Sequence, residues 1–130
     1  MKRTFLNLLI TAILISTVHF SAQAGSMGDY AISEETYTRA FDNRFQGEET
    51  LGWGEELSTA WSRLGAANAC GIQYDKKVAL AKLNQMNNVG DIAHEMNGIY
   101  SNELLAKKFN GFCTDARKTD IKAFIANFLE

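Results

Sequence analysis

Apolar residues recur at helical spacing in five segments of the chain between residues 33 and 130. In the second segment, residues 55–70, apolar side chains repeat at intervals of three and four, the pattern of an amphipathic helix. They are Leu57, Ala60, Trp61, Leu64 and Ala67. Alternation with period two and β-branched residues are both scarce, so little indicates a strand. The pattern predicts an all-α fold, a small bundle of four to five short helices.

The first helix is predicted over residues 33–46. Ser33 stands before two glutamates, which suits an N-cap followed by acids in the first turn. Tyr37, Phe41 and Phe45 follow at intervals of four, so we expect one face of this helix to be aromatic. Gly47, shortly after the last aromatic residue, begins a glycine-rich loop.

Aspartates mark the start of the next two helices. Asp75 and Asp91 each precede an apolar segment, where an aspartate satisfies the amides of a helix N-terminus. They predict helices over residues 75–86 and 91–109. A last helix begins at residue 115 or 119 and ends near residue 129.

The dipeptide Asn97-Gly98 falls inside the fourth predicted helix. It is also the strongest short signal for a β-hairpin. Its flanking residues do not alternate, so we expect a helix that tolerates a glycine cost of about 1 kcal/mol.

Residues 1–24 differ from the rest and have the three parts of a secretory signal peptide. Basic residues come first, an apolar run follows over residues 5–18, and small residues end the segment. The run is shorter than the roughly 20 residues of a membrane span, so no stable span is predicted. We expect cleavage near Ala24 and a single helical domain, residues 25–130, exported to a bacterial periplasm or secreted.

Removal of the signal peptide changes the charge of the working molecule. The full chain has a formal charge of −2, and the loss of two bases and no acid lowers it to −4. This leaves no basic excess for a nucleic-acid backbone, so no nucleic-acid partner is expected. His94 becomes the only histidine, which excludes a metal site built on several histidines.

Cys70 and Cys113 are the only cysteines. In an exported protein an even number of cysteines predicts disulfides, so we expect one bridge from the end of the second helix to the connection between the fourth and fifth. A redox pair usually has C-x-x-C spacing, and a zinc site needs two more ligands. An intermolecular bridge is the remaining alternative. The chain-entropy model assigns the intramolecular bridge a stabilisation of roughly 4 kcal/mol.

No arrangement of residues predicts catalysis. His94 has the setting of a surface histidine beside acids, and a zinc motif H-E-x-x-H would need a second histidine where Gly98 stands. The adjacent acids are Glu34/Glu35, Glu48/Glu49 and Glu55/Glu56. Neighbours on a helix point about 100° apart, so these acids form no facing pair. We therefore expect no catalytic residue, no metal ligand and no cofactor.

Two aromatic residues outside the helices are the candidates for a partner-binding site. Trp53 is flanked by glycines, and Tyr74 follows the second helix. Tryptophan and tyrosine are enriched among the residues that dominate interface energies. The alternative for Trp53 is that its ring folds back onto the first or second helix as core, where Trp61 is expected.

A signal peptide, short helices, one disulfide and no active site are shared by several kinds of small binding protein. Immunity proteins against cell-wall toxins, secretion or conjugation accessory proteins and acid-stress chaperones are of this type. We therefore expect a non-enzymatic protein that binds another protein in the periplasm, in an oligomeric state that the sequence leaves open.

Two alternatives of a different kind remain. One is a small-molecule or lipid carrier with an apolar cavity between helices, lined by Phe41, Phe45, Phe109 and Phe124. The other is a cell-envelope enzyme whose carboxylates converge only in the fold.

Overall fold

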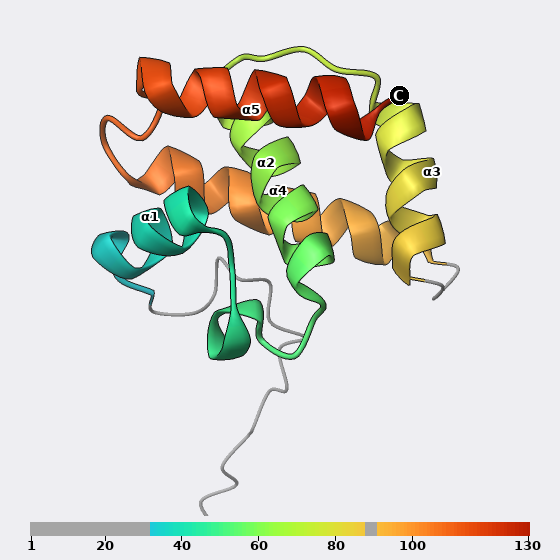
Figure 1. Ribbon diagram of the computed structural model, residues 1–130, viewed down its shortest axis with the longest axis horizontal. Helices are drawn as coiled ribbons and strands as arrows, with labels where there is room; N and C mark the ends of the chain where they lie inside the picture. Colours follow the sequence, from blue (N-terminus) through green and yellow to red (C-terminus); the bar gives the residue numbers. More distant parts are fainter. Residues whose placement is uncertain (1–31, 88–90) are drawn as a thin grey trace, which may run out of the picture.

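The computed structural model describes residues 32–87 and 91–130, and these ranges contain five α-helices, one 3-10 helix and no strand (Figure 1). The elements are α1 (Glu34–Asn43), η2 (Gly47–Thr50), α2 (Glu55–Ala69), α3 (Lys76–Asn87), α4 (Ile92–Lys108) and α5 (Asp115–Phe128). The predicted all-α fold is therefore confirmed. The expected signal peptide and its cleavage site near Ala24 lie outside the described residues.

Helix α2 is at the centre of the bundle and buries most of its length. Figure 1 shows it crossing α4, with α1 and α3 on opposite sides and α5 along one edge. At the crossing, a Cβ on Gly65 would overlap the Ile99 carbonyl and the Glu103 amide of α4. This close approach of two backbones explains a glycine in a helix interior, where it otherwise costs about 1 kcal/mol relative to alanine.

Helix α1 ends earlier than the aromatic spacing predicted. Ser33 caps it as expected, its hydroxyl accepting from the Thr36 amide at 3.1 Å. The chain then leaves the helix at Arg44, where φ is 70°. Phe45 therefore lies outside α1, although it is fully buried and its ring centre lies 5.8 Å from that of Tyr37. The helix predicted over residues 33–46 is wrong at its C-terminal end, while its aromatic residues do belong to the core.

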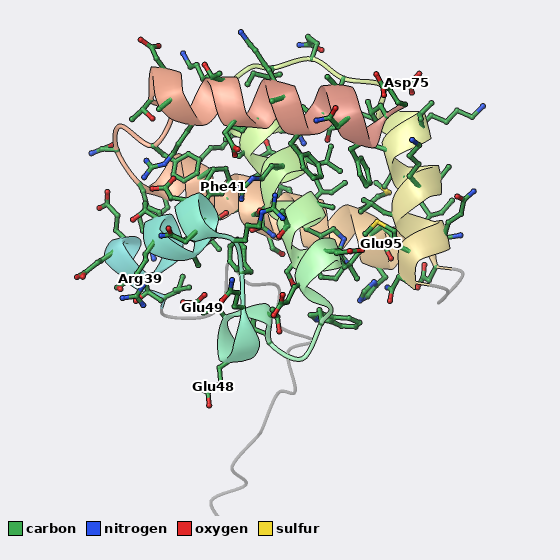
Figure 2. All side chains as sticks on the ribbon, in the orientation of Figure 1. Arg39, Phe41, Glu48, Glu49, Asp75 and Glu95 are labelled. Atoms are coloured by element: carbon green, nitrogen blue, oxygen red, sulfur yellow. A yellow bond between two sulfur atoms is a disulfide. The ribbon has the colours of Figure 1, made fainter. Side chains whose placement is uncertain are left out.

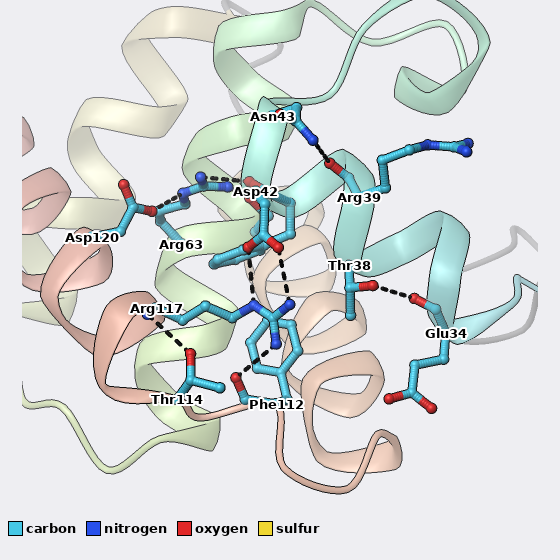
Figure 3. A network of polar contacts seen from close by, with 12 residues as sticks. Glu34, Thr38, Arg39, Asp42, Asn43, Arg63, Phe112, Thr114, Arg117 and Asp120 are labelled. Carbon is cyan, nitrogen blue, oxygen red and sulfur yellow. Dashed lines mark hydrogen bonds and ion pairs between the residues drawn. The ribbon is translucent and has the colours of Figure 1, made fainter.

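A buried arginine of α2 holds the last turn of α1. Arg63 is only 4% exposed, and its Nη2 donates to the Phe41 carbonyl at 2.6 Å (Figure 3). Its guanidinium carbon also lies 3.9 Å from the centre of the Phe41 ring. Nε donates to Asp120 of α5 at 3.0 Å. A cation at a helix C-terminus is favourable, so this one side chain caps α1 and joins it to α2 and α5.

Arg117 of α5 forms the outer part of the same network. Its Nε and Nη2 donate to the two carboxylate oxygens of Asp42, both at 3.0 Å, and its Nη1 donates to the Phe112 carbonyl at 3.1 Å (Figure 3). The hydrogen bond with Asp42 raises the pKa of Arg117 above its usual value. Bidentate pairs fix orientation as well as distance, so α1 is held to α5 in one geometry.

The predicted disulfide between Cys70 and Cys113 is present, with Cα atoms 5.5 Å apart. It joins the end of α2 to the connection between α4 and α5, as expected. Gly71 has φ 71°, and the Ile72 amide donates to the Ala67 carbonyl at 2.8 Å. Together with the left-handed glycine, this hydrogen bond is the Schellman motif that ends many helices.

The apolar residues of α4 are divided between two faces. Ile99 is buried, with Glu95, Asn102 and Ala106 on the same side of the helix. A second series, spaced by four, lies between 38% and 55% exposed: Ile92, Met96, Tyr100 and Leu104. We call these four residues the α4 outer face.

The four phenylalanines considered as a cavity lining do not come together. Phe41, Phe45 and Phe109 pack in one aromatic cluster with Tyr37 and Phe112, with ring centres between 5.0 and 6.4 Å apart. Phe124 instead stacks on Phe128, its neighbour along α5, at 5.1 Å. The four rings therefore line no shared space.

Candidate functional site

The loop between α1 and α2 is compact and presents two large apolar side chains to solvent. We call residues 47–54 the Trp53 loop. The Thr50 hydroxyl donates to the first carbonyl of η2 at 2.7 Å, and the Trp53 amide donates to the Thr50 carbonyl at 3.0 Å. Leu51 has φ 53°, a left-handed backbone that leucine adopts rarely. Leu51 is 46% exposed and Trp53 is 41% exposed.

Trp53 is partly exposed but also packed. Its ring centre lies 4.6 Å from that of His94 and 5.5 Å from that of Trp61. His94 and Trp61 are themselves 5.3 Å apart, and Trp61 is buried as expected. Three rings therefore support one another, with Trp53 outermost. The expectation of Trp53 as a core residue is correct only for the side of the ring that meets Trp61 and His94.

Next to Trp61 and His94 lies a fully buried carboxylate, Glu95 of α4, which is labelled in Figure 2. The Trp61 indole N–H donates to one carboxylate oxygen at 2.7 Å, and the Asn87 amide donates to the other at 2.8 Å. Burying a polar or charged group is costly unless it is hydrogen-bonded, and both oxygens of Glu95 are. Glu95 thereby fixes the Trp61 indole and connects α2, α3 and α4.

His94 lies beside Glu95 and Asn87, and we call these three residues the polar centre. The Asn87 amide nitrogen lies 3.1 Å from His94 Nδ1, and that ring nitrogen is 3.4 Å from a Glu95 oxygen. Both contacts use the same ring nitrogen, so Nδ1 accepts from Asn87 in one tautomer and donates to Glu95 in the other. A carboxylate beside an imidazole is also used in general acid–base catalysis. Here, however, both oxygens of the carboxylate accept from neutral donors, and the acid has no exposed surface. What the centre does is hold the aromatic rings in place.

Helix α4 runs through Asn97-Gly98, and the packing of Trp61 explains why a glycine stands there. The Trp61 indole covers this position, and a Cβ there would overlap the ring. The helix predicted through the dipeptide is therefore confirmed, and the glycine makes room for the tryptophan that binds Glu95.

Tyr74, the second predicted binding residue, is half-buried in a surface groove between α3 and α4. The groove has a volume of about 160 Å³, with Leu80, Met96 and Tyr100 among its apolar lining. Burial raises the pKa of Tyr74, and a hydrogen bond with Asn68 partly opposes this. The groove continues into one edge of the α4 outer face.

Trp53 and Tyr74 do not form one site. Trp53 contacts His94, whereas Tyr74 shares its groove with Met96. Two residues apart on a helix means about 200° around its axis, so His94 and Met96 point to nearly opposite sides of α4. Trp53 and Tyr74 therefore belong to two separate surfaces of the part of the chain that the structure describes.

The polar residues beneath Trp53 were not predicted from the sequence. Glu95 is there only one of the acids beside His94, and Asn87 directly follows the helix predicted over residues 75–86. The available signal was the helical period: Glu95 shares a face with Ile99, Asn102 and Ala106. A glutamate in that buried series must find hydrogen-bond donors inside the fold.

Comparisons of the chain with models of known protein families, with curated proteins and with solved structures found no match. Among the helices in the described residues, none is long and apolar enough to span a membrane. Within residues 32–87 and 91–130, no group of three or more histidine, cysteine, aspartate or glutamate residues is placed to hold a metal ion. What the chain does is therefore inferred from its own geometry.

Proposed function

We propose that this chain is a small exported, non-enzymatic protein that binds another protein through the Trp53 loop. The observation that supports this best is Trp53 itself. Its ring is 41% exposed, yet its position is fixed from below by Trp61 and His94. A large aromatic side chain that is already ordered loses little entropy when a partner covers it, which suits an interface anchor.

The backbone of the Trp53 loop supports the same role for Leu51. A leucine in left-handed conformation is strained, and its side chain is 46% exposed rather than buried in the core. Neither backbone preference nor internal packing accounts for a leucine here. Contact with a partner does.

The charge around Trp53 indicates the kind of partner. Residues 45–62 contain four glutamates and no lysine or arginine. Arg39 of α1 lies 3.8 Å from Glu49, while Glu48 points away from the rest of the chain (Figure 2). Complementary charge raises association rates and selects among partners. The proposed partner therefore presents a basic surface with an apolar hollow for Trp53 and Leu51.

The compartment belongs to the same proposal. Residues 1–24 have the order of a signal peptide, and the disulfide between Cys70 and Cys113 suits an oxidising compartment. A periplasmic role as an immunity, secretion or conjugation accessory, or stress-chaperone protein fits these features. Expression of the full chain in a bacterium should yield a periplasmic product that begins at Gly25, as measured by intact mass. An uncleaved product in the cytoplasm would contradict export.

Binding can be tested with the oxidised mature chain immobilised on a resin and a periplasmic extract of the organism that encodes it. We expect a basic protein that is retained by the wild type and by the control Val78→Ala, which truncates an exposed residue of α3. Trp53→Ala should weaken retention by about 30-fold, the effect of losing a central aromatic anchor. The double variant Glu48→Lys/Glu49→Lys should weaken it as well, and wild-type binding should fall as salt increases. Identical retention by wild type and Trp53→Ala would refute the proposal.

A further inference from the structure

The chain contains two Asn-Gly dipeptides, and they lie in different surroundings. Asn97-Gly98 is in the middle of α4, whereas Asn110-Gly111 is in the turn that follows this helix. Asn-Gly is the dipeptide at which an asparagine loses its side-chain amide most readily, because glycine has no Cβ to hinder attack by its own amide nitrogen. The two dipeptides share this chemistry, so their surroundings decide which of them reacts.

Asn110 and Gly111 are the two central residues of a four-residue turn. The Phe112 amide donates to the Phe109 carbonyl at 3.2 Å, and Gly111 has φ 73° while Asn110 keeps a negative φ. This combination is typical of a type II turn, which favours glycine at its third position. The hydrogen bond of the turn uses the amide of Phe112 and leaves that of Gly111 free. In the described part of the chain, the Gly111 amide donates to no backbone carbonyl.

The Asn110-Gly111 dipeptide is also open to solvent. Both residues are exposed, and a Cβ placed on Gly111 would meet no atom within 4 Å other than those of its chain neighbours. Within residues 32–87 and 91–130, no hydrogen bond holds the Asn110 side chain. Its carboxamide is therefore free to rotate toward the Gly111 nitrogen.

The Asn97-Gly98 dipeptide has none of this freedom. Both residues lie inside α4, where each amide donates to the carbonyl four residues earlier. The Asn97 carbonyl also accepts from the Ser101 hydroxyl at 2.7 Å, and the Gly98 carbonyl accepts from the Asn102 amide at 2.9 Å. The Trp61 indole covers Gly98. The nitrogen that would attack is therefore engaged in the helix and fixed in position.

We propose that Asn110 is a modification site of this chain, at which deamidation forms aspartate and isoaspartate, while Asn97 stays intact in the fold. The Gly111 nitrogen gives its proton to solvent and attacks Cγ of Asn110. A C–N bond forms, the side-chain nitrogen takes a proton from water and leaves as ammonia, and a five-membered succinimide remains. Water then opens this ring at one of its two carbonyls. Opening at the Cγ carbonyl gives aspartate, and opening at the main-chain carbonyl gives isoaspartate.

Either product changes the turn between α4 and α5. Both replace the neutral amide of Asn110 with a carboxylate. Isoaspartate also runs the main chain through Cγ, which adds one atom to the path from Phe109 to Phe112. The hydrogen bond between these two residues then cannot close the same ring, whereas Cys113 remains joined to Cys70 at the end of α2. We expect the turn to loosen while the disulfide still holds the two segments together.

Incubation of the mature oxidised chain at about pH 8 and 37 °C, followed by reduction and tryptic peptide mapping, tests the proposal. Trypsin cleaves after Lys108 and Arg117, so Asn110 and Asn97 fall in different peptides. Peptide 109–117 should gain the mass of deamidation and separate into two isomers. Deamidation at Asn110 should be at least about tenfold faster than at Asn97, because a helix must open locally before its amides can react. The rate should rise with pH, since the Gly111 nitrogen attacks after it loses its proton.

Unfolding provides the control for the role of the fold. In guanidinium chloride with the disulfide reduced, Asn97 loses its protection, so both dipeptides should react at similar rates. Asn110→Gln keeps a side-chain amide but would need a six-membered ring, so peptide 109–117 of this variant should stay unmodified. If Asn97 reacts as fast as Asn110 in the folded chain, or Asn110 reacts only after unfolding, the proposal is wrong. None of these measurements involves a partner of the Trp53 loop, so their outcome is independent of the proposed function.

Discussion

Two buried charged side chains, Arg63 and Glu95, sit in different parts of the bundle and are satisfied in different ways. Arg63 has charged and neutral acceptors: the Asp120 carboxylate, the Phe41 carbonyl and the Phe41 ring. Glu95 has neutral donors, the Trp61 indole and the Asn87 amide, with His94 close by. Arg63 joins α1, α2 and α5. Glu95 instead contacts Trp61 and His94, the two rings that support the partly exposed Trp53.

The different partners indicate different roles for the two side chains. Arg63 completes a helix terminus and an ion pair, so its contribution is to the stability of the fold. Glu95 positions rings that reach the surface, so its contribution extends to the shape of the Trp53 loop. Substitutions at the two sites should therefore differ in which measurement they change as well as in size.

The largest effect is expected from Arg63→Met, which keeps the apolar stem of the side chain but removes the guanidinium. We expect the free energy of unfolding to fall by roughly 2–4 kcal/mol, because the Phe41 carbonyl loses its donor and Asp120 its partner. Urea denaturation followed by circular dichroism measures this. Arg39→Met is the control, since that arginine is 60% exposed and should change stability by less than about 0.5 kcal/mol. If the two variants are equally stable, Arg63 does not hold α1 against α2 and α5.

Glu95→Gln should be less costly for stability but should alter the surface. A glutamine amide can accept from only one of the two donors that Glu95 satisfies, so we expect a loss of about 1–3 kcal/mol. The Trp61 indole should shift, and acrylamide quenching of tryptophan fluorescence in the native state should increase. Glu103→Gln is the matched control. If quenching stays unchanged in Glu95→Gln, the carboxylate does not position the rings.

Alkaline pH should destabilise the aromatic cluster near Arg63. Burial raises the pKa of Tyr37 above its ordinary value of 10.0, with the Arg63 charge opposing this in part. A group whose pKa is higher in the folded state contributes its full stability below the unfolded-state pKa and loses it as pH rises. The free energy of unfolding should therefore fall above about pH 10.

Tyr37→Phe separates this contribution from other alkaline effects. The variant loses the hydrogen bond from the tyrosine hydroxyl to Asn102, 2.9 Å long, so it should be about 1 kcal/mol less stable at neutral pH. Its stability should then decline less steeply than that of the wild type between pH 10 and 11. Parallel curves for the two proteins would contradict burial as the cause.

The smallest effect is expected from Asp42→Asn. This change weakens the bidentate pair with Arg117, but the Asp42 side chain is 47% exposed, so water and salt screen the interaction. We expect a loss of at most about 1 kcal/mol at low salt, and less at 1 M NaCl. A loss as large as that of Arg63→Met would mean that Arg117, as much as the buried Arg63, holds α1.

The helices could be predicted from the sequence because their signals are local. Asp75 and Asp91 cap the helices they precede, and their carboxylates accept hydrogen bonds from the Val78 and Ala93 amides. Gly71 ends α2 with the left-handed backbone that is typical of a glycine after a helix. The disulfide followed from the number of cysteines and the expected compartment.

The two polar centres could not be predicted in the same way, because their partners are distant in sequence. Arg63 binds residues 22 positions before it and 57 positions after it. Glu95 depends on Trp61, 34 positions away. The division of α4 into a buried and an exposed series was also missed, since a helix with apolar residues on two sides does not reveal which side the core will take.

The hydrogen bond from Arg63 to the Phe41 carbonyl also imposes an order on folding. Helix α1 has ten residues, too few to be stable alone in water. It leaves the ribosome before α2, yet its final turn is completed by a side chain of α2, and its ion pair with Arg117 requires α5. Of the helices in the described residues, the one synthesised first therefore needs α2 and α5 in place before it is stable. Until then Tyr37 and Phe41 lack Arg63, Phe109 and Phe112, the later residues that cover them in the fold.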